Sequence, residues 1–324
     1  MQKFSKLFSL LFIMAVTAFI LYIFLWYFTG NQSITQSAFQ SIVSRRLSHV
    51  IAMTVAAILI AVSSLSFQTI TNNRLLTPSM LGFDAVFIAT QTFLIFIFGT
   101  NSTFFSNPYY NFIISSFVMI FISLSLYSFI LKKNKNQIFV LLLVGLVIST
   151  LISSITSFIQ RIMNPDELDT VISASMVSIG NINTKIIYLA IPLMIILIGL
   201  FYKNRRYYDT MTLGDDNAIN LGVDYHKKTK ETMIYIAFSM AIATALIGPI
   251  TFLGLLTVNL AREIFKTYRH SVIMLGSSLI AIITLVLGQL IIEQLKIGVP
   301  VTVLINLIGG AYMIYLIWRM KPSD

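Results

Sequence analysis

The sequence predicts an all-α, polytopic integral membrane protein with about ten transmembrane helices. Hydrophobic residues make up 57% of the 324 residues, charged residues only 10%, and the mean hydropathy is +0.86. A soluble domain carries roughly 25% charged residues, so this chain has too few to cover a surface that faces water. Long apolar runs recur along the whole chain, and the basic residues gather between alternate runs.

Ten apolar runs are candidate spans, because a helix needs about 20 apolar residues to cross a bilayer. The third and eighth are short, and the eighth begins at Gly248-Pro249, a pair that breaks a helix. Short or broken spans are tolerated where neighbouring protein shields their backbone. The expected spans cover residues 7–28, 49–68, 83–99, 109–131, 137–160, 184–201, 231–247, 250–265, 272–292 and 299–318.

The basic residues predict that both termini lie in the cytoplasm. With the N-terminus inside, 17 of the 22 basic residues fall on the inner side, as the positive-inside rule requires. The first run is longer than a signal-peptide core and no cleavage site follows it, so we expect a retained span. The net charge of +10 then indicates topology and lipid contact rather than nucleic-acid binding. The outer loop between Arg161 and Lys185 is expected to hold a short surface helix.

The longest polar segment, residues 203–230, separates the sixth and seventh runs and is basic at both ends. Its centre has the pattern of a short amphipathic helix that docks against a cytoplasmic partner, although a solvated loop is an open alternative. The predicted parts are a break at Gly214, an N-cap from Asp215 or Asp216, an apolar stripe of Ala218, Ile219 and Leu221, a stop at Gly222 and a second capped turn at Asp224.

Several kinds of chemistry are excluded by what the sequence lacks. There is no GxxxxGK[ST] phosphate loop, no HExxH, no GxSxG and no cysteine. His49, His226 and His270 lie at span edges far apart in the sequence, which argues against a metal site. Asp84 and Glu293 are acidic residues near span ends, and the middles of the expected spans hold none. An ion-coupled carrier usually keeps ionisable groups at mid-membrane, so we expect the driving energy to come from elsewhere, with an ion-coupled secondary transporter as the alternative.

Three polar stretches carry the candidate functional residues. The first is QTITNNRLLTPSMLG at 68–82 and the second is IGPITFLGLLTVNLAR at 247–262. The third is the outer pair Arg45-Arg46 with His49 and Lys296, which run against the positive-inside trend. Each stretch also has a purely structural alternative. The first could be an ordinary hairpin, the second could hold Asn259 only as a packing residue, and the third could contact lipid headgroups.

Together these stretches resemble the membrane permease of type II ABC importers, the iron–siderophore and cobalamin (FecCD) family, over about residues 40–318. NNRLLTPSMLG resembles the family's RNPLADPxxLG, and MTLGDDNAINLGV resembles LALGExxAxxLGV. GPITFLGLLTVNLAR resembles GPIGFIGLxxPHxxR, RRLSH resembles RLPR, and KIGVP resembles LPxG. The chain departs from these motifs at Arg74, Thr77, Val258-Asn259 and His49. The stretch TITNNRLLTPSMLG looks closest to that of permeases for catecholate or petrobactin-type siderophores.

The resemblance implies a single transmembrane permease domain over residues 1–324 in the bacterial cytoplasmic membrane. It implies a homo- or heterodimer of permeases with two ABC ATPase subunits inside and a siderophore-binding protein outside. The chain would pass an iron–siderophore complex by alternating access. It would not be an enzyme and would bind no cofactor, since ATP and Mg²⁺ belong to the ATPase.

The resemblance also implies roles for particular residues. ATPase coupling falls to Leu213, Gly214, Asp215, Ala218, Leu221 and Gly222. A cytoplasmic gate falls to Asn73 and Leu75, with a second near the Lys132–Gln137 turn. Docking of the binding protein falls to Arg45, Arg46, His49 and Lys296, and pathway or structural roles fall to Pro78, Gly82, Gly248, Pro249, Gly254, Asn259 and Arg262.

Overall fold

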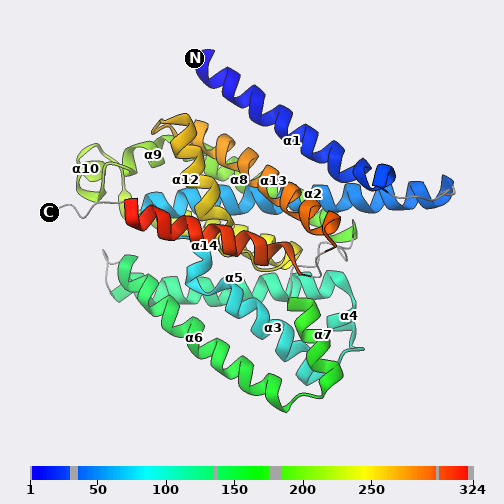
Figure 1. Cartoon of the computed structure of the whole chain (residues 1–324). Coiled ribbons are helices and arrows are strands. Elements are labelled where there is room, and N and C mark those ends of the chain that lie inside the picture. Colours follow the sequence, from blue (N-terminus) through cyan, green and yellow to red (C-terminus); the bar gives the residue numbers. More distant parts are fainter. Residues whose placement is uncertain (1, 30–35, 134–137, 176–183, 297–298, 320–324) are drawn as a thin grey trace.

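A computed structural model describes residues 2–29, 36–133, 138–175, 184–296 and 299–319, and all regular structure within these ranges is helical (Figure 1). The elements are α1 Gln2–Thr29, α2 Gln36–Ile70, η1 Pro78–Leu81, α3 Phe83–Phe98, α4 Thr103–Ser106, α5 Pro108–Lys133, α6 Ile138–Ile162, α7 Pro165–Ser175, α8 Thr184–Lys203, α9 Arg205–Met211, α10 Asp215–Asn220, α11 Tyr225–Ile247, α12 Leu253–Phe265, α13 His270–Gln294 and α14 Val301–Arg319.

Ten of these helices match the ten predicted spans. Eight are long and apolar enough to cross a membrane, namely α1, α2, α5, α6, α8, α11, α13 and α14. The other two are α3 and α12, which correspond to the two spans that the sequence predicted to be short. At 1.5 Å per residue they reach only about 24 and 20 Å, less than the roughly 30 Å hydrocarbon core. The prediction of ten helices with a short third and eighth is confirmed.

Helix α2 is the central element of the fold. From Val55 to Ile70 every residue except Ile58 is buried, and the helix packs against α8, α11, α12 and α13. Small side chains such as Ala56, Ala57 and Ala61 allow this close approach, as is usual between helices in membranes. Figure 1 shows the blue α2 running through the middle of the bundle.

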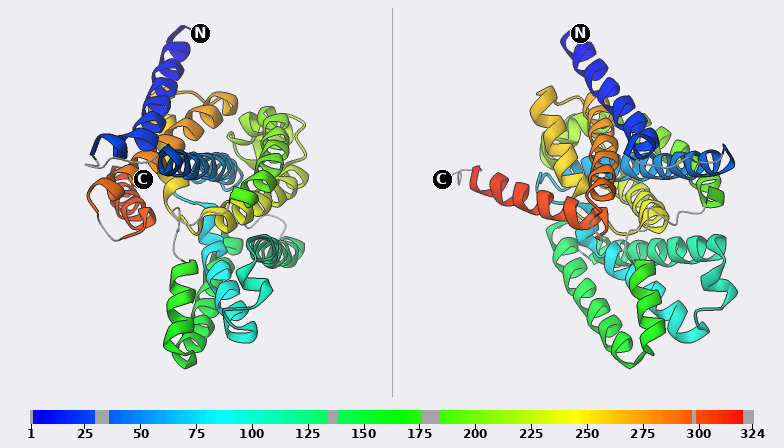
Figure 2. Two further views of the ribbon diagram at one scale, coloured as in Figure 1. Left: turned by 90° about the vertical axis from the view of Figure 1, so that its right-hand side faces the viewer. Right: turned by 45° about the vertical axis from the view of Figure 1, so that its right-hand side comes forward.

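A second group of helices lies beside this central bundle. Helix α3 packs against α5, α6 and α7, and α11 connects the group to the central bundle through contacts with α5. Figure 2 shows these cyan and green helices as a separate layer, with α1 at the opposite edge. Helix α7 carries Asp166 and Glu167 in its first turn, which confirms the short helix predicted between Arg161 and Lys185.

The short helix α12 is positioned by a break and a close contact. Helix α11 ends at Ile247, and residues 248–252, which include Pro249, are not α-helical before α12 begins at Leu253. A Cβ atom added at Gly254 would lie 2.6 Å from the Cβ of Ser64 on α2, closer than packed atoms approach. Glycine is therefore needed where α12 lies against α2. Gly248, Pro249 and Gly254, for which pathway or structural roles are expected, lie in this break and at this contact.

Two predicted helix starts were wrong. Helix α2 begins at Gln36 rather than near residue 49, so the RRLSH motif is helical and is not an outer loop. Helix α11 begins at Tyr225 rather than residue 231. Both errors have one cause, because the apolar run marks the hydrocarbon-facing part of a helix and the polar turns beyond it carry no such signal.

Candidate functional site

Residues 204–224 join α8 to α11, and we refer to them as the α8–α11 connection. The sequence predicted one short helix here, whereas the structure has two, α9 and α10. Helix α9 was missed because its sequence, RRYYDTM, has no clear apolar stripe. The fully buried Tyr208 holds it in place, with its hydroxyl hydrogen-bonded to Thr232 Oγ1 of α11 at 3.1 Å. Burial raises the pKa of the Tyr208 phenol above its usual range, so the hydroxyl keeps its proton.

Polar contacts fix both ends of this connection to α11. Lys228 Nζ donates to Asn204 Oδ1 at 3.3 Å and to Glu231 Oε2 at 2.7 Å. Asp224 accepts from the backbone N–H of Lys227 at 3.1 Å and so caps the N-terminus of α11. The predicted second capped turn is therefore the first turn of a transmembrane helix. The connection is therefore attached to a long span.

Helix α10 lies between two glycines in the left-handed region, Gly214 at φ 93° and Gly222 at φ 84°, as the sequence predicted for Gly222. The predicted N-cap was wrong. Gly214 is the N-cap residue, and Asp215 and Asp216 occupy the first turn without a side-chain capping bond. There they still interact favourably with the positive end of the helix dipole.

The apolar residues of α10 and its flanks point in two directions. Ala218 is fully buried, whereas Leu213, Ile219 and Leu221 are 56%, 48% and 64% exposed. We call these three exposed side chains the apolar patch. Exposed apolar side chains on a polar connection make this surface a candidate site for contact with another protein. Ala218, predicted as part of the same stripe, instead packs the helix onto the body of the protein.

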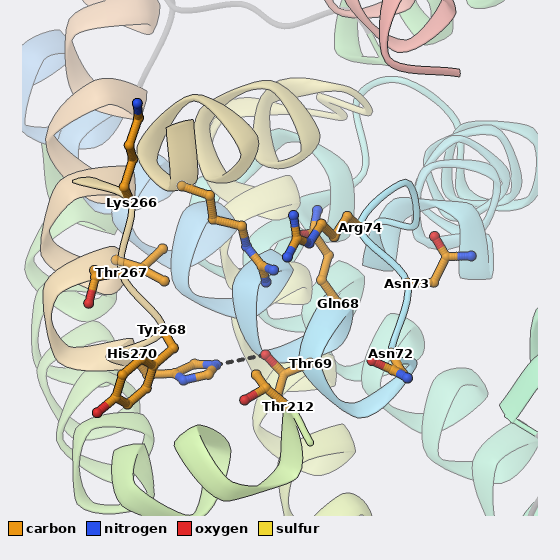
Figure 3. A pocket seen from close by; sticks show the side chains of 12 residues that line it. Gln68, Thr69, Asn72, Asn73, Arg74, Thr212, Lys266, Thr267, Tyr268 and His270 are labelled. Carbon is orange, nitrogen blue, oxygen red and sulfur yellow. Dashed lines mark hydrogen bonds between the residues drawn. The ribbon is translucent and has the colours of Figure 1, made fainter. Parts of the chain in front are cut away.

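A chain of hydrogen bonds links α9 to α13 and α2. Asp209 Oδ1 accepts from the backbone N–H of His270 at 2.6 Å and from its Nδ1 at 2.8 Å. The other ring nitrogen, Nε2, is hydrogen-bonded to Thr69 Oγ1 at 2.8 Å, as Figure 3 shows. We call Asp209, His270 and Thr69 the relay. It was not predicted from the sequence, because its residues are separated by up to 201 positions and form no motif. It connects the surface helices to the C-terminal end of the central helix α2.

The loop after α2, residues 71–77, contains the predicted cytoplasmic gate residues and is called the gate loop. Asn73 Oδ1 accepts from the backbone N–H of Leu75 at 2.9 Å, which closes a tight polar turn. Asn259 Nδ2 donates to the backbone oxygens of Arg74 at 3.0 Å and Leu255 at 2.9 Å. The asparagine that replaces a family histidine thus ties α12 to this loop. Of the second predicted gate turn, residues 134–137 lie outside the described residues.

Between the gate loop and the α12–α13 turn lies a pocket of about 410 Å³ (Figure 3). Arg262, predicted as a structural residue, is among the residues that line it. The others come from the end of α2, the gate loop, the α8–α11 connection, the α12–α13 turn and the start of α13: Gln68, Thr69, Asn72, Asn73, Arg74, Thr212, Lys266, Thr267, Tyr268, His270 and Ile273.

At the opposite end of α2 lies a partly buried polar cluster. Arg46 donates from Nη2 to Glu293 Oε2 at 2.8 Å and from Nη1 to the backbone oxygen of Tyr22 at 2.6 Å. The Tyr22 hydroxyl donates to Glu293 Oε1 at 2.9 Å and is hydrogen-bonded to His49 Nδ1 at 3.2 Å. Gln289 Nε2 also donates to Glu293 Oε1, at 2.9 Å. The cluster joins α1, α2 and α13.

The four residues expected to dock a binding protein therefore divide into two pairs. Arg46 is paired within the chain and His49 is 5% exposed, so both face inward. Arg45 and Lys296 are exposed. Arg46 lies 24 residues before the end of α2, about 36 Å along the helix axis. That distance puts the cluster at the membrane surface opposite the gate loop, given a hydrocarbon core of about 30 Å.

Two further residues predicted to be structural lie at the start of α3. Pro78 is buried and begins η1, and a Cβ added at Gly82 would lie 3.3 Å from the Cβ of Ser149 on α6. Next to them, Asp84 Oδ2 accepts from Thr251 Oγ1 at 2.8 Å. Asp84 thereby holds the non-helical stretch before α12 in place, which gives this acidic residue near a span end a structural role.

Comparisons with known proteins agree with this architecture. The chain is 42% identical to the petrobactin import system permease protein YclO of Bacillus subtilis, over 93% of this chain and 94% of that protein. It is 31% identical to the petrobactin import system permease protein FatC of Bacillus anthracis, over 89% and 82%. A solved structure of a metal-chelate type ABC transporter in an inward-facing conformation superposes with a TM-score of 0.84 at 19% identity, covering 98% of this chain and 100% of that one.

The similarity extends over almost the whole chain rather than over isolated motifs. The model of the FecCD transport family matches residues 4–319. This range holds the gate loop, the α8–α11 connection and, apart from the first residues of α1, the ten helices that match the predicted spans. The resemblance seen in five short motifs is thereby confirmed. This chain belongs to the FecCD transport family.

Proposed function

We propose that this chain is the permease subunit of an ATP-driven importer that passes an iron–siderophore complex across the cytoplasmic membrane. The observation that carries the proposal is the apolar patch of Leu213, Ile219 and Leu221, which is exposed on a connection anchored to a transmembrane helix. Such a patch fits a groove on a cytoplasmic ATPase. The relatives, two petrobactin import permeases, support an iron–siderophore as the substrate.

The contacts suggest how ATPase movement reaches the gate. A push on α10 moves α9, because the two are adjacent in the connection, and α9 is joined to α2 and α13 through Asp209, His270 and Thr69. The gate loop follows directly after α2. Binding of ATP to the partner then shifts the population between outward- and inward-open states, with ATP and Mg²⁺ bound by the ATPase rather than by this chain.

The partners follow from the same proposal. A second permease subunit, identical or different, completes the conduit, and an extracytoplasmic siderophore-binding protein docks on the outer face. Arg45 and Lys296, the exposed pair among the four predicted docking residues, are the candidates for meeting its carboxylates. Both termini then lie in the cytoplasm, as the positive-inside distribution predicts.

Co-purification tests this function. The chain is extracted mildly from its native membrane after crosslinking, and every co-purifying protein is identified. Recovery of an ATPase with a Walker motif supports the proposal, and recovery of a second ten-span chain indicates a heterodimer. Recovery of this chain alone after crosslinking would contradict the proposal and favour an ion-coupled secondary transporter.

A further inference from the structure

The pocket between the gate loop and the α12–α13 turn carries positive charge without a carboxylate in its lining. Arg74, Arg262 and Lys266 all line it, and no Asp or Glu does. Arg262 is half-buried, its Nε has no hydrogen-bond partner among the described residues, and the charge of Arg74 acts on it. Like charges that share a confined site repel each other, so the pocket favours a bound anion.

Gln68 adds a second, independent observation. Its side chain is 2% exposed and lines the pocket, and neither Nε2 nor Oε1 has a hydrogen-bond partner among the described residues. Leaving a buried polar group unpaired costs about 1–3 kcal/mol. In Figure 3 the side chains of Gln68 and Arg74 extend toward the same part of the pocket. The amide therefore offers the two N–H groups of Nε2 as donors and Oε1 as an acceptor to whatever the arginines attract.

The arginine charges and the unpaired Gln68 amide together favour one kind of anion. The guanidinium groups and the Gln68 Nε2 donate, so they need acceptor oxygens, whereas Gln68 Oε1 needs a donor. Inorganic phosphate and phosphate monoesters supply both near neutral pH, since their second pKa is about 6 to 7 and one oxygen can still carry a proton. Sulfate and phosphodiesters have no such proton. We propose that Gln68, Arg74 and Arg262 form a binding site for inorganic phosphate or a phosphate monoester.

The position of the site means that a bound phosphate would connect the gate loop to α12. Its walls come from the end of α2, the gate loop, the α12–α13 turn and, through Thr212, the α8–α11 connection. A phosphate held by Arg74 and Arg262 would fasten the gate loop to α12, beside the existing bond from Asn259 to the Arg74 carbonyl. Phosphate binding stands independently of the proposed transport function, and only the effect on gating rests on it.

Thermal unfolding of the full-length chain in nanodiscs of zwitterionic lipid tests the site. Inorganic phosphate is titrated against sulfate and chloride at matched ionic strength, so that general charge screening is equal in each series. A parallel series replaces part of the lipid with phosphatidic acid, a monoester, or with phosphatidylglycerol, a diester. These arms distinguish free phosphate from a lipid headgroup as the source of the same chemistry.

Three variants locate the effect. Arg262→Gln removes one donor, and we expect the half-saturating phosphate concentration to rise at least tenfold. Gln68→Glu places a carboxylate among the arginines, so this variant should be as stable without phosphate as the wild type is with it, and should not respond to phosphate. Arg206→Gln is the matched control, because Arg206 is an exposed basic residue on the same side that does not line the pocket.

The expected result is stabilisation by phosphate or phosphatidic acid that Arg206→Gln retains, that Arg262→Gln shows only at phosphate concentrations at least tenfold higher, and that Gln68→Glu does not show. Equal stabilisation by sulfate or phosphatidylglycerol would overturn the inference, because recognition of the phosphate proton is its core. A response to neither phosphate nor phosphatidic acid, or the same response in Arg262→Gln as in the wild type, would also overturn it.

Discussion

The relay of Asp209, His270 and Thr69 shows how a few side chains connect a surface helix to the centre of the molecule. His270 is fully buried, so its backbone N–H and its ring nitrogens depend on protein partners. Asp209 Oδ1 satisfies two of these groups at once. One carboxylate oxygen therefore holds the start of α13 against α9.

Substitution of Asp209 tests this arrangement. Asp209→Ala leaves two buried donors unpaired and should lower the free energy of unfolding by about 1–3 kcal/mol. Asp209→Asn keeps an oxygen at the same position and should lose less. Thermal unfolding of the purified chain measures both. Equal stability of the alanine variant and the wild type would show that the hydrogen bonds of Asp209 do not contribute to the free energy of unfolding.

The outer basic residues make a second prediction at this scale. Arg46→Glu places two carboxylates against each other and should destabilise the junction of α1, α2 and α13, while Glu293→Arg added to it should restore stability. Arg45→Glu, one residue away and exposed, should leave unfolding unchanged and weaken binding-protein affinity, more so at low salt. A stability loss in Arg46→Glu that Glu293→Arg does not rescue would contradict the internal pairing.

At the scale of elements, the short helices divide into those the sequence could predict and those it could not. Helix α10 was predictable because Gly214 and Gly222 mark its ends, and α3 and α12 because their apolar runs are short. Helix α9 and the first turns of α2 and α11 were not, since polar helical turns resemble loops in sequence. Arg46 was predictable as unusual but not as internal, because its partner Glu293 lies 247 residues away.

Helix α10 carries the prediction at this scale. Leu221→Asp introduces a charge at the most exposed position of the apolar patch and should abolish co-purification with the ATPase while the chain still folds. Asn220→Asp, the matched control, adds the same charge to an exposed polar neighbour outside the patch and should retain the partner. Normal co-purification of Leu221→Asp with the ATPase would show that the apolar patch is not part of the ATPase interface.

At the scale of the whole molecule, one central helix links the two membrane surfaces. Helix α2 carries Arg46 toward one end and Thr69 at the other, and both belong to hydrogen-bonded clusters that include α13. A displacement of α9 at one end of α2 can thus reach the cluster at the other end through rigid, packed helices. The apolar runs predicted this layout of ten helices, whereas the clusters at both ends come from side chains that only the fold brings together.

The most direct test of the account is siderophore uptake by proteoliposomes that contain the chain with its co-purified partners. We predict accumulation of a petrobactin-type iron–siderophore against its gradient that requires ATP and the ATPase, and that persists when proton and sodium gradients are collapsed. Accumulation by the chain alone, or uptake that ignores ATP and stops when those gradients are collapsed, would contradict the account.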